Sequence, residues 1–310
     1  MAHVPGLDRA VDFVCGQQEA DGCWRDWRLP PGESRMWTTA YVGYRLASLC
    51  GTRHDALAPA LARAAAWLES AALPDGGWGY SAIAGPDADS TALAIIFLRS
   101  IDKALPAGAV ATLLRHQQDD GGFATFTPEW SHGAWIVSHP DVTATALAAL
   151  ARAGCAGTAE SVDRGLHYLW RHRATDALWR SYWWTSPLYA TEAVSACVAA
   201  LDQPLPAAEL VETLSAWRDC SVFDAALRLL TLERIGAAGS EAARECVLTL
   251  ERTQSADGGW PSAAELRLTD RQVYEPWLVA NSGPVFVDER RLFTTVTAMS
   301  ALASVERPIR

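Results

Sequence analysis

Three aspartates stand where an acid catalyst could be built. Asp87 and Asp89 lie two positions apart in the stretch GPDADSTA at residues 85–92, and Asp141 opens a second apolar segment. Two carboxyl groups that are close together in a dry site cannot both ionise, so the pKa of one of them rises. Such a group stays protonated near neutral pH and can still give its proton away. An Asp followed by Ser and Thr is also a good N-terminal helix cap, and both interpretations remain open.

The aromatic composition is the second unusual feature. The chain has 14 Trp and only 7 Phe. Trp is bulky and carries a polar N–H, so it is a poor default filler for a core. We therefore expect the Trp residues to have particular places, some in structural turns and others in a pocket.

A short repeat accounts for part of the aromatic set. The tetrapeptide D-G-x-aromatic recurs along the chain, and a worn copy has Ala177 in place of its Gly. The Gly permits a positive φ after a helix, and the aromatic side chain can then pack back over the helix end. We expect a structural role for the aromatic residues of these copies, which are Trp24, Trp78, Phe123, Trp179 and Trp260. In three copies a Gln precedes the Asp by three positions and can bond freed backbone groups: Gln18, Gln117 and Gln254.

Two kinds of helical pattern flank the repeats. The first kind alternates charged and apolar faces, as expected of an outer helix. It covers residues 7–18, 59–70, 107–117, 161–172, 207–217 and 240–253. The second kind is apolar almost all round, as expected of a helix that is buried on both sides. It covers residues 37–49, 90–102, 142–154, 189–201, 222–235 and 292–304, with a short turn at 219–222 before the fifth. No long alternating β pattern occurs, so the sequence predicts an all-α (α/α)6 barrel of six helix pairs.

The repeat resembles the QW motif of squalene–hopene cyclases and related class II terpene cyclases. The resemblance covers nearly the whole chain, residues 1–310, as one barrel domain, and the second helical domain of those enzymes is absent. Protein prenyltransferase β subunits and complement-type thioester domains carry similar repeats. A more specific motif is needed to choose among these families.

The stretch at residues 85–92 resembles the D-x-D-D-T-A signature of class II cyclases, which protonate an alkene or epoxide to start cyclisation. By this resemblance Asp89 matches the middle Asp, the proton donor, and Asp87 matches the first. Ser90 departs from the signature, because the family has Asp at that position.

Two further stretches support the resemblance. Residues 176–191 are similar to the D-G-x-W-x-G-R-W…Y-x-T segment, which implies that Trp183 lines the cyclisation cavity. Residues 141–145 resemble the D-V-T-x-H segment, whose His partners the catalytic Asp. Thr145 replaces that His here, and His139 or His132 in the preceding loop could take its place.

Aromatic residues outside the repeat copies could stabilise the carbocation that protonation creates. Aromatic faces attract cations by about 0.5–2 kcal/mol per contact without acting as nucleophiles. These residues precede or open the inner helices, so they should converge on one mouth of the barrel, although each could instead simply anchor a loop. The set is Trp37, Trp130, Trp135, Trp183, Trp184, Tyr189, Tyr274 and Trp277. The long segment 261–291 is a candidate lid that would exclude water.

Competing functions lack their motifs. A protein prenyltransferase needs a zinc site of Asp, Cys and His, and Cys197 in mid-helix is the nearest candidate. Residues 14–18 only superficially resemble a thioester motif, and Asp119-Asp120 is followed by Gly-Gly rather than by a diphosphate-ionising D-D-x-x-D motif. The serious alternative is a barrel that binds an isoprenoid or another apolar ligand, or a repurposed acid-catalysed isomerase or lyase.

The composition limits which partners the protein can have and where in the cell it is expected. The net charge of −10 argues against nucleic acid as a partner. No apolar run is long enough for a transmembrane helix, no secretory signal opens the chain, and peripheral membrane contact is compatible with the sequence. Seven scattered Cys without a C-x-x-C pair indicate reduced thiols, no structural zinc and a cytoplasmic location.

The sequence thus predicts a proton-initiated cyclase or isomerase of a short isoprenoid, acting as a monomer or homodimer. We expect no metal site and no cofactor, with Mg²⁺ relevant only if the substrate carries a diphosphate. Arg180, Arg290 and Arg291 could meet a diphosphate, but solvated surface positions are the better explanation of each.

Overall fold

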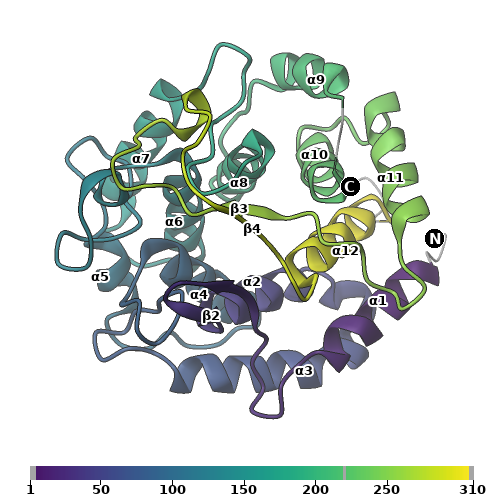
Figure 1. The fold of residues 1–310 in the computed structure, drawn as a ribbon, viewed down its shortest axis with the longest axis horizontal. Helices are drawn as coiled ribbons and strands as arrows, with labels where there is room; N and C mark the ends of the chain where they lie inside the picture. Colours follow the sequence, from purple (N-terminus) through teal and green to yellow (C-terminus); the bar gives the residue numbers. More distant parts are fainter. Residues whose placement is uncertain (1–4, 219–220, 307–310) are drawn as a thin grey trace.

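The computed structural model describes residues 5–218 and 221–306, and within these ranges it contains twelve α-helices in two concentric rings (Figure 1). The inner ring consists of α2 (Met36–Ala47), α4 (Ala88–Ser100), α6 (Pro140–Ala153), α8 (Pro187–Ala200), α10 (Val222–Arg234) and α12 (Leu292–Glu306). The outer ring consists of α1 (Pro5–Gly16), α3 (Cys50–Ser70), α5 (Ala109–Leu114), α7 (Ala159–Arg171), α9 (Ala207–Ala216) and α11 (Glu241–Thr253). Each inner helix contacts the next, and α12 contacts α2, so the ring is closed. The predicted (α/α)6 barrel is confirmed.

The helix boundaries follow the sequence patterns closely in the inner ring and less closely outside it. Every inner helix begins within two residues of its predicted start. The outer helix α3 begins at Cys50 instead of 59 and runs through Pro59, a residue that more often opens a helix. The outer helix α5 ends at Leu114, three residues before its predicted end. Of the predicted turn at 219–222, Asp219 and Cys220 lie outside the described residues.

The difference between the rings is one of burial. In α4, ten of the thirteen residues are buried. In the strongly amphipathic outer helix α7, only Gly165, Tyr168 and Leu169 are buried. The apolar core therefore lies between the two rings and along the inner helices.

The repeat turns staple each outer helix to the following inner helix. The Trp24 indole N–H donates to the Val14 carbonyl at the end of α1 (2.9 Å), and the Trp24 backbone N–H donates to the Thr39 hydroxyl in α2 (2.9 Å). The same pair of bonds recurs at Trp78, Trp179 and Trp260, and Phe123 keeps the backbone bond alone. The structural role expected for these aromatic residues is therefore confirmed by their contacts.

The repeat glutamines connect neighbouring outer helices. The Gln117 amide donates to the Gly121 carbonyl in its own turn and to the Ser161 carbonyl in α7. The Gln254 amide donates to the Gly6 carbonyl in α1 at 2.7 Å, which joins the last outer helix to the first. This hydrogen bond thus joins the two ends of the outer ring, while packing of α12 on α2 joins the two ends of the inner ring.

Two small hairpins, which the sequence did not predict, sit at one end of the barrel. The strands β1 (Asp26–Leu29) and β2 (Gly32–Ser34) are antiparallel, and so are β3 (Glu265–Arg267) and β4 (Val285–Val287). Figure 1 shows β3 and β4 crossing the centre of the ring. The segment 261–291 is therefore a structured crossing with a short hairpin at its base.

A buried arginine fastens this crossing to the barrel. The Arg267 guanidinium donates to the backbone carbonyls of Ser181, Tyr182 and Trp184 at 3.0–3.3 Å. The Trp183 carbonyl also accepts a hydrogen bond from the Arg267 backbone N–H. The crossing therefore keeps a fixed position over the heads of the inner helices.

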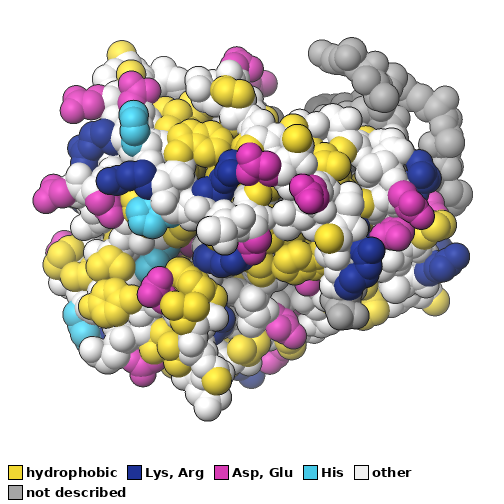
Figure 2. Space-filling view, turned by 90° about the horizontal axis from the view of Figure 1, so that it is seen from above, with side chains coloured by type: hydrophobic (Ala, Val, Ile, Leu, Met, Phe, Trp, Pro, Cys, Tyr) yellow, Lys and Arg dark blue, Asp and Glu magenta, His cyan; other side chains and the backbone are white. Residues whose placement is uncertain are grey.

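The surface is of mixed character. Side chains of both charges are interspersed with apolar ones over the face in Figure 2. Among the helices of the described residues, none combines the length and apolar character needed to cross a bilayer. Of the predicted reduced thiols, those of Cys15, Cys23, Cys155 and Cys197 are unbridged, while Cys220 and the Cys50 side chain lie outside the described part.

Candidate active site

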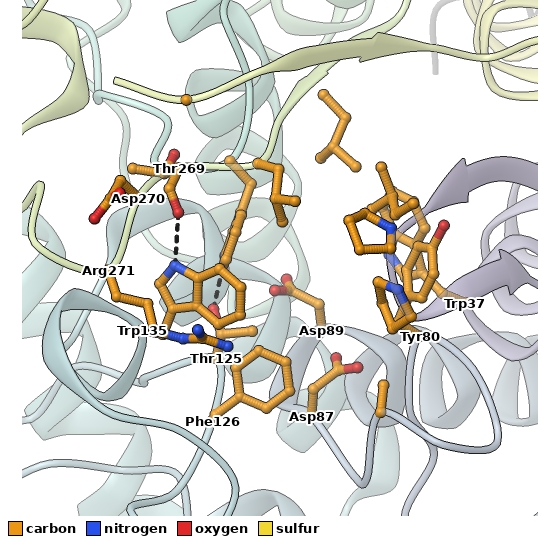
Figure 3. Close-up of a pocket in the computed structure, with 18 of the residues that line it drawn as sticks. Trp37, Tyr80, Asp87, Asp89, Thr125, Phe126, Trp135, Thr269, Asp270 and Arg271 are labelled. Atoms are coloured by element: carbon orange, nitrogen blue, oxygen red, sulfur yellow. Dashed lines mark hydrogen bonds between the residues drawn. The ribbon is translucent and has the colours of Figure 1, made fainter. Parts of the chain in front are cut away.

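A cavity of about 820 Å³ opens at the end of the barrel where the inner helices begin. Its walls come from the heads of α2, α4, α6 and α8, the β1–β2 turn, the loop at 125–135 and the crossing segment at 266–284. Figure 3 shows Asp89 pointing into this space, with aromatic side chains around it. The three aspartates singled out in the sequence all line the cavity.

Asp87 is the N-cap of α4. One of its carboxylate oxygens, Oδ1, accepts the Ser90 backbone N–H at 2.7 Å, and the other, Oδ2, accepts the Ser90 hydroxyl at 2.8 Å. Burial raises the pKa of Asp87 to about 6, although both Ser90 bonds oppose the rise. The capping interpretation therefore holds for Asp87, and Ser90 supports that cap.

Asp89 differs from Asp87 because its carboxyl group has no hydrogen-bond partner in the part of the chain that the structure describes. Burial, together with the neighbouring Asp141 and Asp87 carboxylates, raises the pKa of Asp89 well above its ordinary value. Its side chain sits in the first turn of α4 and faces the cavity (Figure 3). The surroundings of Asp89 therefore favour its protonated form, and no side chain or backbone group among the described residues accepts a hydrogen bond from it.

Asp141 lies in the first turn of α6 and is almost fully buried. One carboxylate oxygen, Oδ2, accepts the backbone N–H groups of Tyr182 and Trp183 at 2.9 and 3.3 Å. The other oxygen, Oδ1, is buried without a hydrogen-bond partner. Burial raises the pKa of Asp141 to about 6, so it is largely ionised at neutral pH and acts on Asp89 as a nearby negative charge.

Aromatic rings form most of the remaining wall. Trp37 lies 6.0 Å from Tyr80 and 6.1 Å from Trp184 between ring centroids, and Trp184 stacks on Tyr189 at 4.2 Å. On another side Trp135 meets Trp183 edge to face at 5.1 Å. Several π faces thus border one apolar space next to the acid.

The structure brings most of the predicted site residues together. Nine of them line the cavity: Asp87, Asp89, Asp141, Trp37, Trp130, Trp135, Trp183, Trp184 and Tyr189. Trp130 is half exposed at the rim and packs over Gly85.

Four predicted residues do not line the cavity. Thr145 is buried one turn along α6, and its hydroxyl donates to the Asp141 backbone carbonyl at 3.0 Å. His139 stacks on Tyr182 at 3.6 Å and bonds the Ala134 carbonyl, and it is not part of the cavity wall. Tyr274 and Trp277 lie on the outward side of the crossing segment and are exposed.

Burial lowers the pKa of His139 to about 4, which makes it a neutral ring at physiological pH. The alternative His132 does line the cavity.

Sequence reasoning missed several lining residues. Tyr80 follows the second repeat copy by two positions, and its hydroxyl donates to the Trp27 carbonyl of the first hairpin at 2.8 Å. Leu29 and the two prolines of the β1–β2 turn were also missed. The Pro-Pro-Gly turn between two Trp residues was the available signal for a hairpin. Arg271 was missed as well, because it sits inside a long irregular segment.

The three arginines considered for a diphosphate have other partners, in agreement with the surface interpretation. Arg180 pairs with Asp176, Arg290 pairs with Glu19, and Arg291 pairs with Asp257, all away from the cavity. Within the described residues, no group of three or more His, Cys, Asp or Glu side chains is arranged to hold a metal ion.

Comparisons with known proteins agree with this architecture. Residues 2–121 match the family model described as the squalene-hopene cyclase C-terminal domain. A curated relative, drimenyl diphosphate synthase of Streptomyces showdoensis, is 29% identical over 267 residues, which are 84% of this chain and 42% of the relative. The chain thus spans about two fifths of the length of that relative.

Solved structures share the whole fold. The type II terpene cyclase MstE from Scytonema, in complex with geranylgeranyl dihydroxybenzoate, superposes with a TM-score of 0.82 at 24% identity, covering 96% of each chain. A protein from Actinoplanes superposes with a TM-score of 0.82 at 25% identity, covering 97% of this chain and 99% of that one. The chain therefore has the fold of the type II terpene cyclase MstE, and its residues 2–121 are similar to the squalene-hopene cyclase C-terminal domain.

Proposed function

We propose that the protein is a class II terpene cyclase that protonates an alkene of an isoprenoid with Asp89. The observation that carries the proposal is the Asp89 carboxyl group itself, which has no hydrogen-bond partner among the described residues, faces an aromatic cavity and lies near two other carboxyl groups. The curated relative, whose name is that of a terpene synthase, and the MstE complex with an isoprenoid substrate support an isoprenoid as the ligand.

The surroundings of Asp89 favour a carboxylic acid that keeps its proton near neutral pH. Burial, together with the charges of Asp141 and Asp87, raises the pKa of Asp89 well above its ordinary value. The absence of a fixed acceptor for that proton leaves it available to the substrate. This division of roles among neighbouring carboxyl groups is a common way of running acid chemistry near pH 7.

In the proposed first step, one proton passes from the Asp89 carboxyl group to an alkene carbon. The π electrons of an alkene form a new C–H bond with the Asp89 proton, the O–H bond breaks, and Asp89 becomes a carboxylate. The positive charge moves to the more substituted carbon, where a further alkene of the same chain can attack it and close a ring. The final cation loses a proton or takes up water, and Asp89 regains a proton from solvent.

The wall aromatics would stabilise these cations. Trp37, Trp184 and Tyr189 lie around the same apolar space as Asp89 and offer π faces without a nucleophile. Each well-placed contact contributes about 0.5–2 kcal/mol. The crossing segment 261–291 would act as the lid that keeps water from quenching the cation, because its residues 266–272 form part of the cavity wall.

The first experiment combines substrate screening with the Asp89→Asn variant. Geranyl, farnesyl and geranylgeranyl alcohols and diphosphates are incubated with the protein, and products are identified by mass spectrometry. Asp89→Asn keeps the shape of the side chain and removes the acid, so we expect turnover to fall by about 10³-fold or more. In D₂O the wild-type product should gain one deuterium at the protonated carbon.

Asp102→Asn is the matched control, because Asp102 follows the other end of the same helix α4 and lies far from the cavity wall. Turnover that survives Asp89→Asn would disprove the protonation step. If no substrate yields a product but isoprenoids still bind, the departures at Ser90 and Thr145 would instead favour a binding or repurposed barrel.

A further inference from the structure

One cationic side chain stands at the cavity rim without a role in the proposed chemistry. Among the described residues that line the cavity, Arg271 is the one Lys or Arg. It belongs to the crossing segment, and its side chain is exposed at the mouth. A wholly hydrocarbon substrate would have no use for this charge.

The Arg271 backbone is held in place by the loop on the opposite side of the mouth. Its carbonyl accepts the Ala134 backbone N–H at 2.8 Å, and the Trp135 indole N–H donates to the Thr269 carbonyl at 2.8 Å. Gly133 makes this approach possible, since a Cβ there would lie 2.2 Å from the Arg271 carbonyl oxygen. The side chain therefore projects from a fixed anchor.

The Arg271 side chain is also oriented. Its guanidinium lies over the Trp135 ring, 4.1 Å from the ring centroid, and Nε donates a long bond of 3.4 Å to the Ser131 hydroxyl. Figure 3 shows the side chain extended along Trp135, which stacks on Phe126 at 5.7 Å. A cation that is pre-oriented on an aromatic ring loses less conformational entropy when it binds a ligand.

The charge of Arg271 is not neutralised within the described structure. The adjacent Asp270 carboxylate accepts the Gln272 backbone N–H at 2.8 Å in a tight turn. No ion pair to Arg271 occurs among the described residues, whereas Arg180, Arg290 and Arg291 each have a carboxylate partner. The two terminal guanidinium nitrogens of Arg271 thus remain available to a ligand.

We infer that Arg271 binds an anionic head group at one end of the substrate, while the isoprenoid chain extends into the cavity toward Asp89. This inference rests on the proposed function and adds the substrate class, an isoprenoid that carries an anion. His132, which also lines the mouth, can donate a second hydrogen bond. A diphosphate and the carboxylate of a prenylated aromatic acid share this chemistry, and the guanidinium fork suits both.

Equilibrium binding tests the inference without depending on turnover. All proteins carry Asp89→Asn, and calorimetry compares two matched ligand pairs. The first pair is farnesyl diphosphate and farnesol, and the second is a farnesylated hydroxybenzoic acid and its methyl ester. We expect the anion of at least one pair to bind about tenfold or more tightly than its neutral partner. The pair that shows this preference identifies the head group.

Arg271→Gln should abolish the preference and leave the affinity for the neutral ligand within about twofold. Arg271→Lys should retain part of it, and added salt should weaken it, because the contact is electrostatic and solvent-exposed. Arg244→Gln on the outer helix α11 is the matched control, since the Arg244 guanidinium bonds the Gly239 carbonyl beside its own helix and does not line the cavity.

Two results would overturn the inference. One is equal binding of anion and neutral ligand in both pairs. The other is an Arg271→Gln variant that weakens both members of a pair equally, which would show that Arg271 merely supports Trp135. A failure of the acid hypothesis looks different, since Asp89→Asn would then turn over substrate while head-group recognition stays intact.

Discussion

The three cavity carboxyl groups have the same chemistry and different surroundings. Asp87 is tied to Ser90 by two hydrogen bonds, and Asp141 is tied to two backbone N–H groups through one oxygen. Asp89 is held by neither kind of bond. Because hydrogen bonds to the charged form lower a carboxyl pKa, the two tied groups ionise more readily, and their charge adds to the burial that raises the pKa of Asp89.

The Asp141→Asn variant tests this coupling. Asn can keep the acceptor oxygen for Tyr182 and Trp183 and places an uncharged amide at the unpaired position. Removing a negative charge lowers the pKa of Asp89, so Asp89 deprotonates at a lower pH. In profiles of kcat/KM against pH, we expect the alkaline limb to move down by about one pH unit.

The Asp102→Asn variant should leave that limb in place. An unchanged limb in Asp141→Asn would mean that Asp141 does not influence the acid, and that its role is to position the backbone of Tyr182 and Trp183.

At the scale of single residues, the sequence predicted which residues lie near the cavity better than the direction in which each side chain points. The positions of Asp89, Trp183 and Tyr189 at the heads of inner helices followed from motif and periodicity. The direction of His139 did not, because its ring position is decided by stacking on Tyr182, a residue 43 positions away. Likewise the charge of Arg271 was visible in the sequence, but its place at the mouth depends on a backbone contact with Ala134.

At the scale of the elements, the repeat turn was predictable because its chemistry is local. The positive φ and the indole bond to the end of the preceding helix both come from residues within one short stretch. The hairpins were not predictable from local sequence. The strands β3 and β4 pair across a gap of seventeen residues, and they are also held by hydrogen bonds to the barrel. The strands of both hairpins are three or four residues long, too short for an alternating pattern.

The worn repeat copy allows a direct test of the turn. Ala177 has a φ of 68°, the left-handed conformation that its Gly counterparts adopt without strain. Ala177→Gly should therefore stabilise the protein by about 0.5–1 kcal/mol, even after the entropy that Gly costs in the unfolded chain. Urea unfolding followed by circular dichroism measures the change.

The matched control is Ala111→Gly in the exposed part of α5, which should destabilise the protein by about 1 kcal/mol. If both variants lose stability to the same extent, the left-handed conformation of Ala177 carries no strain.

At the scale of the whole molecule, a buried charge network joins three inner helices. Glu192 of α8 bonds the Arg45 guanidinium of α2 through both carboxylate oxygens at 3.0 Å and pairs with Arg234 of α10 at 2.8 Å. Although burial opposes it, the two arginines lower the pKa of Glu192 to about 2. The network links helices on different sides of the barrel axis.

Glu192→Gln should leave the buried Arg45 guanidinium and the partly buried Arg234 guanidinium without this countercharge and cost about 3–5 kcal/mol of unfolding free energy. In the wild type the folded-state pKa of Glu192 lies below its unfolded value of about 4.3, so its stabilisation is present above that pH and is lost as the pH falls toward 2. The variant should lack this part of the acid sensitivity in thermal melts between pH 2 and 5.

Glu209→Gln is the control, because the Glu209–Arg173 pair is on the surface and should contribute at most about 0.5 kcal/mol. Equal losses in the two variants would contradict a structural role for the buried network.

The contacts that join the last helix pair to the first have a consequence for the order of folding. In an open stack of helix pairs, each pair can fold on its neighbour as the chain lengthens. Here α1 bonds the turn after α11 through Gly6 and Gln254, and α2 packs on α12, so the first pair lacks one flank until the last pair has formed. Contacts between such distant segments are slow to form. During synthesis, the apolar flank of the first inner helix stays uncovered until nearly all of the described chain has been made.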